Sequence, residues 1–378
     1  MKILVAVDSF KGSMSSVEAG KAVEKGIKSS IPDAQVEIMP VADGGEGTVH
    51  ALVSGLNGET RRVTVKNPLG EDIVATYGTF GKTAVVEMSA AAGITLIEKE
   101  QLNPLVTTTY GVGQIIADAI ENGYRDFIVG IGGSATNDGG AGMLQALGFE
   151  FYDKDGNDIP FGAQGLNKIV GISDKNVKPE VFKCTFNVAC DVINPLCGEN
   201  GCSVVYGQQK GAKENDIETM DNGMRNYALV TCEKYQNADM NYPGAGAAGG
   251  MGFAFMAFLN GKLQSGISLI LEKTEAEKHI KDADLVITGE GKIDGQTSMG
   301  KVPVGIAQLA KKHKKTVVAF CGCATKEASV LNGYGIDGIF PILRNVCTLE
   351  DAMNTTNAMG NLTDTVCQVM NLYKEMKK

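Results

Sequence analysis

Short, continuous runs of apolar residues recur along this chain and constrain its fold more than any other feature. They lie at residues 3–7, 36–41, 127–131, 285–288, 317–320 and 338–342. None of them shows the in-and-out alternation of a half-exposed strand, so each run indicates a strand that is buried on both faces. Segments with apolar residues at helical spacing follow or precede these runs. One is residues 19–27, which come after a capping box of Ser15 and Glu18. Alternating strands and helices predict an α/β fold with a parallel sheet covered by helices.

A different pattern occupies residues 62–89, where apolar and polar residues alternate and the turn-forming segments NPLGED and FGK intervene. This pattern is typical of antiparallel strands. A chain of 378 residues suits two domains, and both of its ends show strand and helix layers. We therefore expect a discontinuous α/β domain, residues 1–62 plus 280–378. Residues 63–279 are expected to form an inserted, smaller mixed α/β domain, with the active site in the cleft between the two.

Composition excludes several classes of partner. A net charge of −9 and a pI near 5.1 argue against nucleic acid, which selects a basic surface. The nine cysteines show no C-x-x-C spacing, and the chain begins with the strand-like KILVAVD, so we expect a reduced, cytoplasmic protein. The apolar stretch 245–259 is rich in glycine and too short to cross a bilayer, which favours a buried helix over a membrane span.

Glycine-rich loops follow the predicted strands, and the chain holds 48 glycines. The loops begin at Asp8, Asp43, Gly132 and Gly289, and each adds carboxylates or hydroxyl groups to its glycines. A strand-to-helix turn accounts for any one of them, since glycine permits positive φ and Asp or Ser caps a helix. Ligands of parallel sheets bind at the carboxyl ends of the strands, so four such loops on one edge predict a cleft that binds anions and nucleotides.

Two nucleotide motifs match this sequence only in part. Residues 130–135 fit the dinucleotide pattern G-x-G-x-x-A, with Glu150 about twenty residues later, but Glu150 lies in a predicted hairpin and glycines interrupt the expected helix. Residues 295–301 fit a P-loop until Val302 stands where Ser or Thr is required. The chain has three histidines, which give a histidine-centred catalytic triad little support, so any general base should be a carboxylate. An NAD-dependent oxidoreductase and a regulatory nucleotide-binding module remain alternatives at this point.

Taken together, the motifs closely resemble the type I glycerate kinase family. The resemblance covers essentially the whole chain and rests on the segments DSFKGS at 8–13, PVADGGEGT at 40–48, NPLG at 67–70, TTTYGVGQ at 107–114, GIGGSATNDGGAGMLQALG at 130–148, DVINPLCGENG at 191–201, QKGA at 209–212, PGAGAAGGMG at 243–252 and ITGEGKIDGQT at 287–297. It implies a Rossmann-like domain with a second α/β domain, and an enzyme that phosphorylates D-glycerate with ATP and Mg²⁺, generally giving 2-phosphoglycerate. Glycerate and ATP are the implied small-molecule partners, and a homodimer stays open.

The resemblance also implies roles for individual residues. We expect Asp191 to accept the proton of the glycerate hydroxyl group, with Asp43 and Asp8 as rivals for that role. Asp43 and Glu46 are expected to hold the metal ion. Ser9 and Lys11 are expected to hold glycerate or the transferring phosphoryl group, as is Lys292, which stands where the family commonly has arginine. The expected contacts to the nucleotide phosphates are Gly132, Gly133, Ser134, Asn137 and Asp138.

Overall fold

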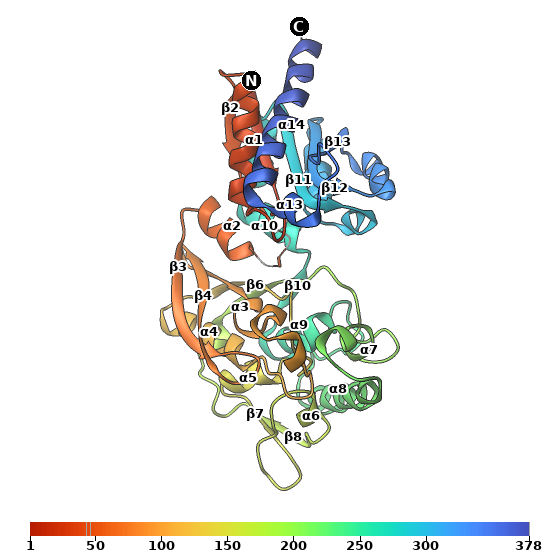
Figure 1. Cartoon of the computed structure of the whole chain (residues 1–378). Coiled ribbons are helices and arrows are strands. Elements are labelled where there is room, and N and C mark those ends of the chain that lie inside the picture. Colours follow the sequence, from red (N-terminus) through yellow and green to blue (C-terminus); the bar gives the residue numbers. More distant parts are fainter. Residues whose placement is uncertain (43, 46, 378) are drawn as a thin grey trace. The chain divides into compact units, whose positions relative to one another are not determined.

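The computed structural model describes residues 1–42, 44–45 and 47–377, and the chain divides into two compact units (Figure 1). The first unit comprises Met1–Asp43, His50–Asn57 and Ile267–Lys378, and the second comprises Gly44–Val49 and Gly58–Gly266. These bounds differ from the predicted ones at residues 44–49, 58–62 and 267–279. The inserted unit also contains more residues than the unit it interrupts, whereas the sequence led us to expect the smaller domain there.

The differences at residues 58–62 and 267–279 have a structural reason. Strand β3 (Glu59–Lys66) pairs along its whole length with β4 (Asp72–Phe80), so the complete hairpin belongs to the second unit. Helix α11 (Ala276–Asp282) contacts strand β1 (Lys2–Val7), so this part of the chain belongs to the first unit.

A five-stranded parallel sheet in the order β13-β12-β11-β1-β2 forms the centre of the first unit. Besides β1, its strands are β2 (Gln35–Ile38), β11 (Leu285–Ile293), β12 (Thr316–Ala324) and β13 (Gly338–Pro341). Ile3 and Val5 share one core cluster with residues of two helices, and Leu4, which points the other way, is equally buried. The strand is therefore buried on both faces, as its apolar run predicted.

Helices α1 (Ser16–Ser30) and α14 (Thr355–Met376) lie side by side over this sheet (Figure 1). The predicted capping box of Ser15 and Glu18 begins α1. Helix α12 (Val302–Lys312) packs on β1, β11 and β12, and α13 (Leu349–Met353) precedes α14. Helices α2 (Thr48–Gly55) and α10 (Gly266–Lys273) stand where the chain passes between the units.

The second unit is built on a six-stranded mixed sheet in the order β10-β9-β6-β5-β4-β3. Its remaining strands are β5 (Thr83–Glu87), β6 (Asp126–Gly130), β9 (Thr185–Ala189) and β10 (Lys262–Gln264). The hairpin of β3 and β4 is antiparallel, as is the pairing of β4 with β5, which confirms the alternation seen at residues 62–89. Strands β5, β6, β9 and β10 run parallel to one another, so their carboxyl ends meet at one edge.

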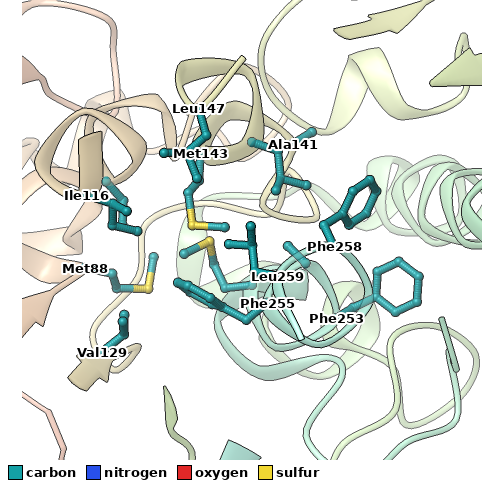
Figure 2. Packing of buried hydrophobic residues seen from close by; sticks show 14 of the residues in the cluster. Met88, Ile116, Val129, Ala141, Met143, Leu147, Phe253, Phe255, Phe258 and Leu259 are labelled. Carbon is teal, nitrogen blue, oxygen red and sulfur yellow. The ribbon is translucent and has the colours of Figure 1, made fainter. Parts of the chain in front are cut away.

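Helices of the second unit enclose an apolar core. They are α3 (Ser89–Ala92), α4 (Tyr110–Glu121), α5 (Ala141–Ala146), α6 (Ala163–Leu166), α7 (Cys202–Tyr206), α8 (Glu214–Lys234) and α9 (Ala247–Leu259). Figure 2 shows Phe255 and Leu259 of α9 packed with Met143 of α5, with Met88 at the start of α3 and with Val129 of β6. Helix α9 is the buried helix expected at residues 245–259, and no helix within the described residues is long and apolar enough to cross a membrane.

The dinucleotide pattern at residues 130–135 does not have the structure that its glycines would require. The first helix after β6 is α5, which has 6 residues and starts only at Ala141. Glu150 lies in β7 (Glu150–Tyr152), which pairs antiparallel with β8 (Gly171–Ser173) and so belongs to no βαβ unit. The structure thus gives an NAD-binding fold no support at this segment.

Candidate active site

A pocket of about 340 Å³ opens in the first unit at the carboxyl ends of its parallel strands. Its polar lining comes from Asp8, Ser9, Lys11, Ser13, Glu290, Lys292, Lys301 and Asn361. Apolar side chains complete the wall, among them those of Phe10, Ile342 and Met353. Four residues that the sequence singled out as candidates, Asp8, Ser9, Lys11 and Lys292, therefore lie around one cavity.

A tight turn after β1 carries the first three of these candidates. The N–H of Asp8 donates to the carbonyl of Gly289 at 2.9 Å, which extends the pairing of β1 with β11 by one residue. The Asp8 side chain is 4% exposed, and its Oδ1 accepts a hydrogen bond from the Ser9 N–H at 2.6 Å. Phe10 and Met14 then exchange backbone hydrogen bonds around Gly12, whose φ of +76° favours glycine. This turn holds Ser9 and Lys11 at the pocket.

The segment from Gly289 to Lys292, expected to be a loop, is instead part of strand β11. The strand runs on to Ile293 because β12 pairs with it as far as Ile293 and Ala324. Glycine is needed here for close packing: a Cβ on Gly289 would overlap the Phe320 carbonyl, and one on Gly291 would lie 3.2 Å from the Cα of Phe10. The extended strand brings Glu290 and Lys292 to the pocket on a rigid element.

Two buried carboxylates and three lysines give this pocket its charge. Glu290 is 7% exposed, and its Oε1 accepts a hydrogen bond from the Thr297 hydroxyl at 2.6 Å. Lys292 lies 3.2 Å from Asp294, but the lysine side chain is 59% exposed, so this ion pair holds it only weakly. Lys301 occupies the N-cap position of α12, directly before the helix. Cations beside carboxylates allow the pocket to bind an anion and to accept a proton.

The glycine-rich loop after β6 lies at the corresponding edge of the second sheet. Gly132 and Gly133 are exposed, and Gly133 has a φ of +75°. The Gly133 carbonyl accepts a hydrogen bond from Ile94 at 2.9 Å, and the Ala135 N–H donates to Ala92 at 2.9 Å. Backbone N–H groups around a left-handed glycine form concave sites that bind anions. The loop therefore exposes Gly132 and Gly133, while its hydrogen bonds to Ile94 and Ala92 hold its backbone in place.

Asp138 lies beneath this loop rather than at its surface. It is 1% exposed, and its carboxylate accepts hydrogen bonds from the N–H and hydroxyl of Thr109, each at 2.8 Å, and from the N–H groups of Gly140 and Gly142. Burial raises the pKa of Asp138, although these hydrogen bonds act in the opposite direction. Its contacts join the start of α4 to the start of α5, so the side chain supports the loop from within.

Asn137 is also buried, whereas Ser134 is partly exposed. The Asn137 amide donates to the Ser203 hydroxyl at 2.8 Å. The Ser134 hydroxyl accepts a hydrogen bond from the Lys210 ammonium group at 2.7 Å. Of the five predicted nucleotide contacts, Gly132, Gly133 and Ser134 thus lie where a ligand could reach them, while the side chains of Asn137 and Asp138 face the interior.

Asp191 follows β9, at the same edge of the second sheet. Its side chain is exposed, and its Oδ1 accepts a hydrogen bond from the Gly266 N–H at 3.0 Å. Glu87 ends strand β5, which β6 separates from β9, and its Oε1 accepts a hydrogen bond from the Val49 N–H at 2.7 Å. The expectation that the four glycine-rich segments share one sheet edge is therefore wrong. Asp8 and Lys292 belong to the first sheet, and Gly132 and Asp191 belong to the second.

The predicted metal ligands Asp43 and Glu46 lie outside the described residues. Within the described residues, no group of three or more His, Cys, Asp or Glu side chains is arranged to hold a metal ion. Asp8 and Glu290, on neighbouring strands, offer oxygen atoms of the kind that Mg²⁺ prefers.

Sequence reasoning missed three charged residues, Glu290, Lys301 and Lys210. Glu290 lies in the GEGKID segment, which was expected at the cleft through Lys292, and Lys301 ends the incomplete P-loop, but neither of these two residues was assigned a role. Lys210 lies in the QKGA segment and is 2% exposed. A lysine between glutamine and glycine carries no signal of burial, because burial of its charge is decided by contacts from distant parts of the chain.

Comparison with known proteins agrees with the resemblance over nearly the whole chain. The model of the glycerate kinase family matches residues 3–374. Glycerate 2-kinase of Escherichia coli (strain K12) is 46% identical over 97% of this chain and 98% of its own, and glycerate kinase of Bacillus subtilis (strain 168) is 43% identical over 93% of both. A crystal structure from Salmonella typhimurium LT2, described as a glycerate kinase 2, has a TM-score of 0.91 at 42% identity and covers 100% of this chain and 99% of that one.

Proposed function

This chain belongs to the glycerate kinase family, and on that premise we propose that it transfers the γ-phosphoryl group of ATP to a hydroxyl group of D-glycerate, releasing ADP. The pocket of the first unit carries this proposal, because it surrounds two buried carboxylates with Lys11, Lys292 and Lys301. Phosphoryl transfer depends on positioning, on neutralisation of negative charge, and on a carboxylate near the attacking hydroxyl group. Glycerate, a small anion with two hydroxyl groups, suits a cavity of this size and charge.

The lysines of the pocket hold the anionic groups in this proposal. Lys11 and Ser9 bind the glycerate carboxylate or the transferring phosphoryl group from the turn after β1. Lys292 adds a second positive charge from the rigid strand β11. A lysine makes a point-charge contact and does not grip a carboxylate with two parallel hydrogen bonds as arginine does. Substrate orientation therefore depends on several groups acting together.

Asp191 is the proposed general base, with Asp8 and Asp43 as the rival carboxylates. Its Oδ1 is oriented by the Gly266 N–H, and its side chain is exposed to an incoming substrate. If Asp191 accepts the hydroxyl proton, Asp191→Asn lowers kcat by roughly 10² to 10⁴. Asp8→Asn is the matched comparison. A kcat near that of the wild type in Asp191→Asn, with a large loss in Asp8→Asn, would transfer the role to Asp8.

The nucleotide phosphates are assigned to the backbone N–H groups of Gly132 and Gly133 and to the Ser134 hydroxyl. Asn137 and Asp138 shape the same loop from the interior. The Mg²⁺ that accompanies ATP is proposed to be held by Asp43 and Glu46, with Asp8 and Glu290 as further oxygen donors. When bound, Mg²⁺ would neutralise charge on the phosphate oxygens.

An ADP-coupled assay over a panel of small hydroxy acids tests the reaction. We expect ADP release that depends on D-glycerate and is weaker with L-glycerate, lactate and glycolate. Phosphorus NMR of the product should show 2-phosphoglycerate and not the 3-phosphate. ADP release that is absent, or that proceeds equally well without glycerate, would refute the proposed function.

The remaining proposals concern where and in what form the enzyme works. The many unpaired cysteines support a reducing, cytoplasmic location, which cell fractionation can check. A homodimer is the assembly to be tested, and light scattering of the purified protein measures its mass directly.

A further inference from the structure

The second unit buries a lysine ammonium group directly behind the exposed glycine loop. Lys210 is 2% exposed. Its Nζ donates to the Ser134 hydroxyl at 2.7 Å and to the Thr136 carbonyl at 2.6 Å. Both acceptors are neutral oxygen atoms. A buried cation whose hydrogen bonds go to neutral groups is costly, so its position calls for a function.

The QKGA segment at residues 209–212 turns this lysine inward. Residues 208–210 form one turn of 3₁₀ helix, which Gly211 ends with a φ of +95°. A Cβ on Gly211 would overlap the Leu102 carbonyl, so glycine is required there for both its conformation and its size. Ala212 is buried, and its N–H donates to the Gly207 carbonyl at 3.0 Å. The segment therefore fixes the backbone from which Lys210 reaches Ser134.

The surroundings of Lys210 leave its positive charge only partly balanced. Burial lowers the pKa of Lys210 to about 8, against smaller opposing effects of Cys202 and Asp138. Burial raises the pKa of the Cys202 thiol to about 12, so this group is neutral at physiological pH. The Asp138 carboxylate accepts hydrogen bonds from Thr109, Gly140 and Gly142. At neutral pH Lys210 is thus mostly protonated, and its positive charge lies close enough to the loop to attract an anion bound there.

We propose that Lys210 is a positioning residue for the nucleotide phosphates. Its hydrogen bonds to Ser134 and Thr136 hold the loop in shape, and its charge attracts the anion that Gly132 and Gly133 bind. A positive charge in a region of low dielectric acts more strongly on a nearby anion than one in water. This inference rests on the proposed function, because that proposal assigns the phosphates to Gly132, Gly133 and Ser134.

Two substitutions separate the charge of Lys210 from its hydrogen bonds. Lys210→Gln keeps donors for neutral acceptors but removes the charge, and Lys210→Arg keeps the charge. We expect Lys210→Gln to raise the KM for ATP at least tenfold, with kcat and the KM for glycerate changed less than threefold, and Lys210→Arg to recover part of the loss. A merely structural role would lower the melting temperature without this separation of KM from kcat.

Lys234→Gln is the matched control. Lys234 lies in the same unit and donates to the Ile172 carbonyl at 3.2 Å and to Asp174 at 2.9 Å, far along the chain from the glycine loop. Its loss should leave the KM for ATP unchanged. An equal rise of this KM in both variants would overturn the role of Lys210, since it would show a general effect of removing a lysine from this unit.

The pH dependence of nucleotide binding gives a second, independent readout. Calorimetric titration with ADP should show wild-type affinity falling between pH 7 and pH 9.5, as Lys210 loses its proton, and a flatter profile for Lys210→Gln. The groups that face Lys210, Cys202 and Asp138, stay unchanged in both proteins. If Lys210→Gln does not fold, the wild-type profile and Lys210→Arg still decide the matter.

The two proposals fail in different ways. Wild-type protein without glycerate-dependent ADP release refutes the proposed function, whereas ADP binding still reports on Lys210. Active wild-type protein whose KM for ATP and pH profile are unchanged in Lys210→Gln refutes the positioning role alone.

Discussion

Removal of the Asp138 carboxylate should destabilise the second unit substantially. Asp138→Ala leaves the N–H groups of Thr109, Gly140 and Gly142 buried without their acceptor. Each unsatisfied buried donor costs about 1–3 kcal/mol, so the gross loss is about 3–9 kcal/mol. Part of it is returned, because burial of the carboxylate itself costs several kcal/mol. We expect the free energy of unfolding to fall by about 3–5 kcal/mol, a large share of typical protein stability.

Asp138→Asn provides a graded comparison. An amide oxygen in place of Oδ2 keeps the contacts to the N–H and hydroxyl of Thr109 and to Gly142, and only Gly140 then faces the amide nitrogen. The expected loss is about 1–2 kcal/mol. Since burial raises the pKa of Asp138, the stability that its carboxyl group gives to the fold is fully present below about pH 4. It is lost as the pH rises through the folded-state pKa, and the wild type should lose its advantage over Asp138→Asn in that direction.

Hydrogen exchange followed by mass spectrometry suits this measurement, because the chain contains no tryptophan and has two units that can unfold separately. The readout is the opening free energy of peptides that cover α4 and α5. A loss below 1 kcal/mol in Asp138→Ala, or a larger loss in Asp138→Asn than in Asp138→Ala, would refute this account of the carboxylate.

Three further predictions concern other parts of the chain. Because burial lowers the pKa of Lys210 from 10.5 to about 8, the wild-type free energy of unfolding should rise by roughly 3 kcal/mol as the pH rises through this interval. Urea unfolding at pH 8 and pH 10.5 measures this rise, which Lys210→Met should not show. Ser15→Ala removes the capping box of α1 and should cost about 1 kcal/mol in thermal unfolding, whereas Ser29→Ala near the helix end should cost less than half of that. The exposed thiol of Cys323 lines the pocket of the first unit, so bound glycerate should slow its alkylation at least fivefold. The exposed Cys232 of the second unit is the control and should react at an unchanged rate. Equal protection of both thiols would contradict the assignment of the pocket.

Much of the first unit could be predicted from local sequence. Continuous apolar runs indicated its strands, and Ser15 with Glu18 marked the start of α1, because these signals depend on residues close together in the chain. The end of β11 could not be predicted in this way. The apolar run stops at Thr288, but the strand continues through Glu290 and Lys292 because β12 supplies its hydrogen bonds.

The candidate site was predictable only where its residues directly follow a strand. Asp8, Ser9 and Lys11 come immediately after β1, and the structure places them at the pocket. Asp138 stands in a glycine-rich loop that resembles a phosphate site, yet Thr109 and Gly142 draw its carboxylate inward. Burial of a charged side chain depends on partners far away in sequence, as with Lys210 and Ser134, and local patterns hold no record of it.

The discontinuity of the first unit has a consequence for how the protein is made. Strand β1 emerges from the ribosome early, but its neighbour β11 begins at Leu285, and α14, which packs on α1, ends at Met376. The second unit, by contrast, is nearly continuous from Gly58 to Gly266. Domains fold as units during synthesis, usually from the N-terminus onward. Here the order is reversed, because the inserted unit can complete its core before the partners of β1 and α1 have been synthesised. These apolar N-terminal elements therefore stay without their native partners, and open to aggregation, for most of synthesis.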